Sequence, residues 1–329
     1  MSECVFEGLL GTVGTSSIVN MGRDIMDIIV KFYNQLNKSY VCIDGGSYRE
    51  GFRMDVSDRD FMVWLKHQRV IWNLSEAQNY KSFKFTLILA DCSDSPPGFS
   101  LLQLLTQRTG GTDGMLHKSC FRMNDKIYIS SSLYIEMKRP IVGIVSKVNG
   151  PCVSGPCGEI EYDAAHSFVS DFWPPVAYSW IKRCQVWPLS NIVNDIVEDG
   201  CHFVTIGHKQ GNHRDNEWRI SFSVAEQRLV RSMDHNQFLI YGLLKLFMRE
   251  VINNTSDENK LLSSYHVKTA VFWIIQSDVL PGCILEGFWV CFKLILKWVY
   301  DGYCPNFFIP ENNMFLGKIF GANQKNFVF

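Results

Sequence analysis

Apolar residues recur at steps of three and four positions near the start of the chain. This spacing runs from Ser16 to Leu36 and is typical of an amphipathic helix, because residues so spaced share one helix face. We expect a long helix here, with Met21 and Met26 in the protein core. The apolar stripe consists of Ile18, Met21, Ile25, Ile28, Ile29, Phe32 and Leu36.

Two strand patterns follow this helix. Tyr40–Asp44 is a short, mostly apolar run that leads into Gly45, Gly46 and Ser47, the composition of a turn. Arg59–Lys66 alternates between two faces. Phe61, Val63 and Leu65 would share one face, and Asp60, Met62 and Trp64 would share the other. We therefore expect a strand, a glycine turn and a second strand.

The middle of the chain mixes loops with strands, and the second half is helical. Asp91–Gly114 is rich in Gly, Pro and Ser around one short apolar piece, Phe99–Leu105. Strands are predicted at Lys126–Ser130, at Leu133–Met137 and, after a turn at Ser154–Pro156, at Glu159–Phe168. Helices are predicted at Ala177–Cys184, Gln237–Asn253, Ser264–Ser277 and Leu285–Tyr300. We expect an α+β fold with a mixed-sheet lobe over 1–172 and a helical lobe over 173–329.

The composition is that of a folded globular protein without a strong overall charge. Of 329 residues, 47% are hydrophobic and 20% are charged, which excludes an extended disordered or low-complexity architecture. The 32 Lys and Arg nearly cancel the 33 Asp and Glu, so any contact with nucleic acid must come from a local patch. The 11 cysteines are an odd number without a C-x-x-C pair, which favours reduced thiols and no zinc site.

The sequence lacks the features of a signal peptide and of a membrane span. It opens with MSECVFEGLL, which has no basic region before its apolar run. The most apolar stretch, Cys283–Tyr300, is interrupted by Glu286, Lys293 and Lys297, which a bilayer tolerates only at a cost. We expect a cytoplasmic protein without a membrane partner.

Acidic residues near the glycine turn are the strongest candidates for chemistry. Asp58 and Asp60 are separated by one residue, so alternation places both carboxylates on one face of the second strand. Two carboxylates opposite a turn that can hold a phosphate would suit a pair of Mg²⁺ ions and a nucleoside triphosphate. Glu161 and Asp163 offer a third carboxylate, and Asp163 is favoured because it lies deeper in its apolar strand. The alternative is a solvated edge strand with an ordinary hairpin turn.

Five sequence strings, spread over nearly the whole chain, together resemble those of one known protein family. They are GGSYREGF, SDRDFMV, WRISFSVAEQRLV, SSYHVKTAVFW and NFFIPENNMF. In their order and spacing they resemble the cyclic GMP–AMP synthase family and its Mab (male-abnormal) relatives, and SSYHVKT is close to diagnostic for the group. Within it, the chain is similar to a short animal cyclic GMP–AMP synthase-like receptor. The resemblance implies a bilobal nucleotidyltransferase whose N-terminal helix is a spine that joins both lobes.

The resemblance also implies roles for individual residues. Gly46 and Ser47 would hold a triphosphate, and two Mg²⁺ or Mn²⁺ ions would be bound by Asp58, Asp60 and Asp163. ATP and GTP would be the substrates. Further nucleotide contacts would come from Arg219, Ser221, Ser223, Lys245, Ser264 and Tyr265, with the Tyr265 ring stacked on a base.

Three of the neighbouring residues also allow structural interpretations. Tyr265 could be an ordinary buried aromatic residue with a satisfied hydroxyl group. Arg219 could form a surface ion pair with Glu217. His266 lies beside Tyr265 but is not required as a general base, because two-metal transfer does not need one.

One element of the vertebrate cyclic GMP–AMP synthase is missing from the sequence. That enzyme has a zinc thumb of one histidine and several cysteines, whereas Leu229–Tyr241 has His235 and no cysteine. We therefore expect no zinc, and double-stranded RNA, another ligand or no activator are the alternatives to DNA. The basic residues near the expected activator face are few, namely Arg23, Lys31, Lys38, Lys182, Arg183 and Lys209.

The resemblance implies an enzyme that makes a cyclic dinucleotide second messenger from ATP and/or GTP. It would act in innate immune signalling through a downstream cyclic dinucleotide receptor and be switched on by a ligand such as double-stranded RNA. The alternative is a catalytically inactive relative that binds a nucleotide or another ligand as a scaffold or sensor. The set of acids favours the enzyme. The sequence leaves open the activator, the bases and linkage of the product, and the oligomeric state.

Overall fold

The computed structural model divides the chain into two compact units. The sheet unit comprises Arg23–Val176 and Asp195–Gln227, and the helical unit comprises Met1–Gly22, Ala177–Asn194 and Arg228–Phe329. Both units draw on separate stretches of the chain, and the boundary near residue 172 remains a prediction. The structure describes residues 2–52, 59–108, 114–139, 146–157, 160–252 and 262–316.

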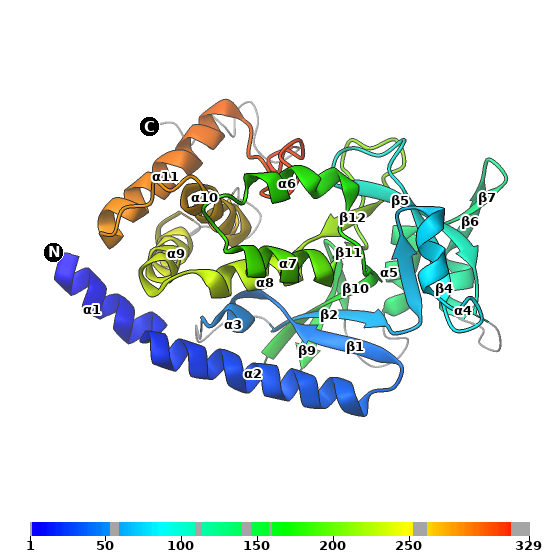
Figure 1. The fold of residues 1–329 in the computed structure, drawn as a ribbon, viewed down its shortest axis with the longest axis horizontal. Helices are drawn as coiled ribbons and strands as arrows, with labels where there is room; N and C mark the ends of the chain where they lie inside the picture. Colours follow the sequence, from blue (N-terminus) through cyan, green and yellow to red (C-terminus); the bar gives the residue numbers. More distant parts are fainter. Residues whose placement is uncertain are drawn as a thin grey trace. The chain divides into compact units, whose positions relative to one another are not determined.

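The sheet unit contains one mixed sheet, which has twelve strands within the described residues (Figure 1). The strands are β1 Tyr40–Asp44, β2 Arg59–Leu65, β3 Gln68–Ile71, β4 Thr86–Asp91, β5 Phe99–Thr106, β6 Cys120–Met123, β7 Lys126–Ile129, β8 Lys147–Asn149, β9 Cys152–Cys157, β10 Ile160–Ser170, β11 Cys201–Val204 and β12 Trp218–Ser221. The main path is β1-β2-β10-β11-β12-β5-β4-β3. Off this path, β7 pairs with β5 and β6, and β9 pairs with β10 and β8. The pairs β2–β10 and β3–β4 are parallel.

β10 organises this sheet because it pairs with three other strands. Its first part pairs with β2 on one side and with β9 on the other, and Ser167–Ser170 continues along β11. Phe168, only 1% exposed, packs against the rings of Tyr134 and Trp218 at centroid distances of 5.0 and 4.9 Å. The Trp218 indole donates a hydrogen bond to the carbonyl of Ile129 (2.8 Å), so this buried donor is satisfied.

The predicted N-terminal helix is confirmed as α2 (Ser16–Leu36), but the face that it buries differs from the predicted stripe. Met26 is buried, as predicted, whereas Met21 is 57% exposed, so its prediction as a core residue is wrong. The buried face also carries Val19 and Arg23. Periodicity identifies residues that share a face, but it does not identify what covers that face. The apolar side chains left exposed on α2 are Ile18, Met21, Ile25, Ile28, Ile29, Phe32 and Leu36.

Other local predictions in the sheet unit need correction. Leu133–Met137 was predicted as a strand and lies in the helix α5 (Ser131–Lys138), whose first turn is capped by the Ser130 side chain. Ser154–Pro156 was predicted as a turn and lies in β9. The glycine turn after β1 continues into a short helix, α3 (Gly46–Glu50). The loop-rich stretch contains β5 and is followed by the short helix α4 (Gly114–Lys118).

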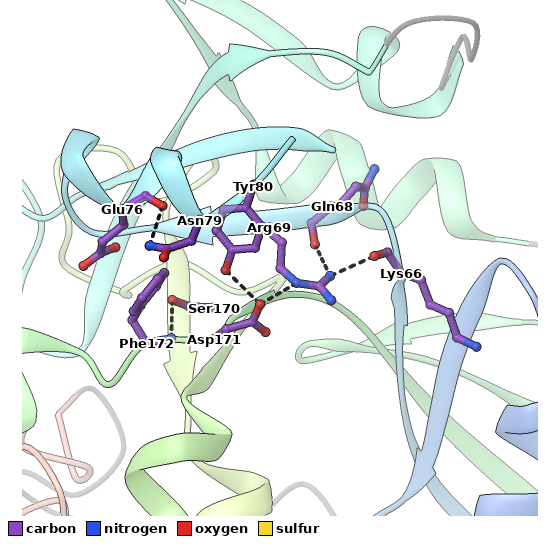
Figure 2. A network of polar contacts seen from close by, with 9 residues as sticks. All are labelled: Lys66, Gln68, Arg69, Glu76, Asn79, Tyr80, Ser170, Asp171 and Phe172. Atoms are coloured by element: carbon purple, nitrogen blue, oxygen red, sulfur yellow. Dashed lines mark hydrogen bonds and ion pairs between the residues drawn. The ribbon is translucent and has the colours of Figure 1, made fainter. Parts of the chain in front are cut away.

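A network around Asp171 joins the end of β10 to β3 and to the 3₁₀ helix η1 (Leu74–Asn79), as Figure 2 shows. The Asp171 carboxylate accepts hydrogen bonds from Arg69 Nε and from the Tyr80 hydroxyl, both at 2.8 Å. Burial, followed by the bond to Asp171, raises the pKa of the Tyr80 hydroxyl. The phenol therefore stays a donor to Asp171 at neutral pH, and the network fixes this edge of the sheet.

The helical unit is built from helices that pack on one another, in agreement with the predicted helical second half. α9, α10 and α11 pack pairwise, and α1 packs against α9 and α11. α7 and α8 contribute residues to both units. The helices are α1 Ser2–Val13, α6 Tyr178–Arg183 after the 3₁₀ turn η2 Pro175–Ala177, α7 Ser190–Asp199, α8 Ser223–Ser232, α9 His235–Phe247 continued by the π-helical turn η3 Met248–Ile252, α10 Ser264–Gln276 and α11 Ile284–Asp301.

Candidate functional site

Two predicted metal ligands lie side by side on one face of the sheet. β2 and β10 are parallel, and their register pairs Asp60 with Asp163. On the other side of β10, Asp163 is paired with Ser154 of β9. Because side chains of paired residues point to the same face, the three form one row across the strands. Ser154 is buried, and its hydroxyl donates a short hydrogen bond to Asp163 Oδ1.

The glycine turn lies directly against Asp60. The N–H of Gly45 donates to the backbone carbonyl of Asp60 at 2.7 Å. Gly46 has a φ of +59°, and a Cβ added there would overlap the Asp60 carboxylate. Only glycine combines this backbone conformation with so close an approach. The Asp60 carboxylate therefore faces the turn that begins α3.

α3 is closed by backbone hydrogen bonds at its C-terminal end and is joined to α2 by one ion pair. The carbonyl of Ser47 accepts a hydrogen bond from Phe52 N–H (3.0 Å), and Gly51 ends the helix with a φ of 106°. Arg49 forms a short ion pair with Asp27 of α2. The N-cap residue of α3 is Gly45, and among the described residues no side-chain hydrogen bond caps this helix. The ion pair thus joins α3 to α2, and the start of α3 has no side-chain cap among the described residues.

The acid row lies beside an apolar cluster on the same face. Met62, Ala165 and Val204 form a buried cluster against which Cys152 packs. Burial, reinforced by the negative charges of Asp163 and Asp60, raises the pKa of the Cys152 thiol to about 12, and the charge of Arg219 opposes this shift. The charges of Asp60, Asp163 and Arg219 therefore all act on Cys152.

The predicted nucleotide contacts of the sheet unit lie on β12 and at the start of α8. Arg219 is half-buried and is paired with Val204 of β11. The hydroxyl groups of Ser221 and Ser223 are hydrogen-bonded to each other at 2.7 Å. Glu217 is fully buried and accepts a hydrogen bond from His208 N–H (2.9 Å), and among the described residues no ion pair joins Glu217 to Arg219.

The remaining predicted contacts lie in the helical unit. Ser264 is the exposed first residue of α10, and Tyr265 is half-buried beside it. The Tyr265 hydroxyl accepts a hydrogen bond from Asn306 Nδ2 (3.0 Å), so the hydroxyl is satisfied as the structural interpretation expects. Lys245 of α9 is 7% exposed, and its ammonium lies 5.1 Å from the centre of the Tyr241 ring.

His266 has a structural role in this segment. Its Nδ1 accepts a hydrogen bond from the N–H of Ser263 (3.0 Å), which caps α10, and its ring packs against Phe315.

Two of the basic residues expected near an activator face are engaged inside their units instead. Arg23 is only 7% exposed, and its Nε donates to the carbonyl of Glu50 (2.8 Å). Arg183 donates to Gln276 Oε1 (2.6 Å) and stacks 4.2 Å from the centre of the Trp273 ring. The sequence could not distinguish these buried arginines from surface ones, because an arginine can pack its long apolar stem inside the protein or extend into solvent.

The other two acids of the predicted set are placed less fully. Asp58 lies outside the described residues. Glu161 is exposed near the start of β10 and is paired with Pro156. Within the described part of the chain, no group of three or more His, Cys, Asp or Glu side chains is arranged to hold a metal ion. Asp60 and Asp163 with the Ser154 hydroxyl are thus the described portion of the candidate centre.

A mixed sheet with paired aspartates beside a glycine turn, joined to a helical segment, is the nucleotidyltransferase-type architecture expected from the sequence. Residues 123–232 match the model of the Mab-21 protein nucleotidyltransferase domain, and residues 240–329 match that of the Mab-21 protein HhH/H2TH-like domain. The chain belongs to the Mab-21 nucleotidyltransferase family. Asp163, Arg219, Ser221 and Ser223 lie in the first matched range, and Lys245, Ser264 and Tyr265 lie in the second.

A curated relative supports the same family. Protein mab-21-like of Drosophila melanogaster is 25% identical to the chain over 162 residues, which are 45% of this chain and 43% of that protein. The match thus spans less than half of the relative. None of the described helices has the length and apolar character needed to cross a bilayer.

Proposed function

We propose that this protein is a metal-dependent nucleotidyltransferase that makes a cyclic dinucleotide second messenger from ATP and/or GTP, in innate immune signalling. The observation that supports this most is the register of Asp60 with Asp163 beside the glycine turn, in a chain that carries a Mab-21 nucleotidyltransferase domain. Hard carboxylate oxygens suit Mg²⁺ or Mn²⁺, so the described donors fit the metal that the family implies.

The metal would be held by Asp60, Asp163 and Asp58. When bound, two divalent ions would supply a lowered pKa for an attacking ribose hydroxyl and neutralisation of charge on a pyrophosphate leaving group. The exposure of Glu161 and its pairing with Pro156 favour Asp163 as the third acid. Ser154 would keep the Asp163 carboxylate oriented through its hydrogen bond.

In the sheet unit, the predicted nucleotide contacts would lie around this row. Gly46 and Ser47 would hold a triphosphate at the uncapped start of α3, where small residues leave space for phosphate oxygens. Arg219 would contact a base edge, and Ser221 and Ser223 would contact the donor nucleotide. In the helical unit, Tyr265 would stack on a base, with Ser264 and Lys245 contacting base edges or phosphates.

Activation by a ligand such as double-stranded RNA is also proposed, with a cyclic dinucleotide receptor as the downstream partner. Of the basic residues considered, Lys31 and Lys38 are exposed on and after α2 and can meet a phosphate backbone. Arg23 and Arg183 are not assigned to this role because both are engaged in their units.

The test is incubation of the purified chain with ATP, GTP, Mg²⁺ or Mn²⁺ and a panel of duplex RNA and DNA, followed by mass spectrometry of the products. Formation of a cyclic dinucleotide that requires the metal ion and both Asp60 and Asp163 supports the proposal. If the protein binds nucleotides by calorimetry but forms no product under any condition, it is the non-catalytic sensor or scaffold of the family.

A further inference from the structure

A cavity of about 810 Å³ lies on the face of the sheet opposite to the acids. Its floor is formed by alternate residues of three neighbouring strands. Asp44 of β1 is paired with Phe61 of β2, which is paired with Ala164 of β10. Phe61 and Ala164 each follow an acid of the row directly in sequence, so they face the other way. The walls come from α2 and α5 of the same unit.

The middle of this cavity is apolar. α2 contributes Met26, Ile29 and Val30, and the strands contribute Phe61, Val63 and Leu65. Ile29 is 52% exposed and Tyr33 is 47% exposed although both line the cavity, so the space is open to solvent along α2. A volume of this size is within the range of ~300–1,000 Å³ that is typical of small-molecule sites.

Charged and polar groups stand at the ends of the apolar region. At the end of β1, the Arg59 guanidinium lies 3.7 Å from Asp44 Oδ1 and 4.0 Å from the centre of the Tyr48 ring. On α5, the Lys138 ammonium lies 4.7 Å from the centre of the Tyr134 ring.

The lining carries a surplus of positive charge. It contains two cations, Arg59 and Lys138, and one carboxylate, Asp44. Burial raises the pKa of Asp44, although the charges of Arg59 and Arg49 oppose that shift. Burial, with the charge of Lys138, lowers the pKa of His166 to about 4, so its ring is neutral at neutral pH. An anion is therefore favoured over a cation or a zwitterion.

We propose that this cavity is a second binding site, for an amphipathic organic anion with an apolar body and one carboxylate or similar head group. The apolar body lies between α2 and the central strands, and the head group lies near Lys138. The proposal does not depend on the nucleotidyltransferase activity, because none of the acid row lines the cavity.

The test is calorimetric titration of the full chain with decanoate, kept below the concentration at which it forms micelles. Decanol is the uncharged control and butyrate is the short anionic control. Decanoate is expected to bind about tenfold more tightly than decanol, since a charge-assisted contact is worth roughly that factor, and butyrate is expected to show no saturable heat.

Three variants assign the binding to the cavity. Val63→Trp fills the floor and should abolish decanoate binding, whereas Ile28→Trp, on the exposed side of α2 and outside the lining, should leave it unchanged. Lys138→Met keeps the length of the side chain, and it should weaken decanoate about tenfold while leaving decanol unchanged.

The outcomes separate this proposal from the nucleotidyltransferase proposal. Equal decanoate binding by Val63→Trp and Ile28→Trp, or no selective effect of Lys138→Met, would overturn it. If thermal melting shows that Val63→Trp does not fold, Lys138→Met alone decides. Absence of nucleotide turnover leaves all these titrations interpretable.

Discussion

The two faces of β1, β2 and β10 hold different chemistry, although neighbouring residues of the same strands build both. One face carries Asp60 and Asp163 beside a glycine turn and an apolar cluster. The other carries the cavity with Asp44 and Arg59 at one end. The difference shows that a single register can align two carboxylates while it places their sequence neighbours around an unrelated pocket. Function can therefore be tested one face at a time.

The largest effect is expected from the acids themselves. Asp60→Asn and Asp163→Asn should each reduce product formation on the order of a thousandfold, because each removes ligand charge without changing side-chain shape. Glu161→Gln is the matched control on the same strand and should retain activity. Rates are measured by mass spectrometry, with decanoate titration as a check of the opposite face. Loss of activity in Glu161→Gln alone would show that Glu161, and not Asp163, is the third acid.

The turn against Asp60 gives the next effect. Gly46→Ala would overlap the Asp60 carboxylate at a backbone φ of +59° and should lower turnover about a hundredfold, because the acid must move. Gly150→Ala is the matched control, since Gly150 has a φ of +57° but nothing within 4 Å of an added Cβ. Both variants carry the backbone strain of about 1 kcal/mol, seen in denaturant unfolding. Equal activity losses would mean that strain, and not the overlap, is responsible.

The acid face could be predicted from the sequence better than the cavity face. Alternation alone placed Asp60 opposite Phe61, and the apolar run of β10 directed attention to Asp163. The pairing of Asp163 with Ser154 could not be read, because Ser154, Gly155 and Pro156 have the composition of a turn and only pairing with β10 makes them a strand. The cavity depends on which side of α2 meets the sheet, and of the predicted apolar stripe only Ile29 lines it.

An effect of intermediate size is expected in the pH dependence of stability, at His166 on the cavity face. Burial lowers the pKa of His166, on the cavity face, to about 4, so the folded protein favours the neutral ring. The stability that this contributes is complete above the unfolded pKa near 6.5 and is lost as the pH falls toward 4. His166→Gln should therefore remove on the order of 2 kcal/mol of the stability difference between about pH 7 and pH 5.

The measurement is urea unfolding of wild type and variant at both pH values. His202→Gln is the comparison, because burial lowers the pKa of His202 to about 4 as well, although His202 is not among the residues that line the cavity. If His166→Gln leaves the pH dependence unchanged, the ring is not buried in its neutral form.

The smallest effect is expected from substitution of Ser154, because it changes the orientation of a proposed metal ligand without removing one. Its hydroxyl donates to Asp163 Oδ1, so Ser154→Ala should leave that carboxylate less well oriented and raise the Mg²⁺ concentration needed for half-maximal activity about tenfold. Ser154→Thr keeps the hydroxyl and should restore most of the affinity. Ser167→Ala, on β10 but with only a 3.4 Å contact to the Val63 carbonyl, is the control for a buried serine. A loss of stability without a change in the metal requirement would show that Ser154 supports the strand pairing and not the acid, because orientation of a ligand must appear in the metal titration.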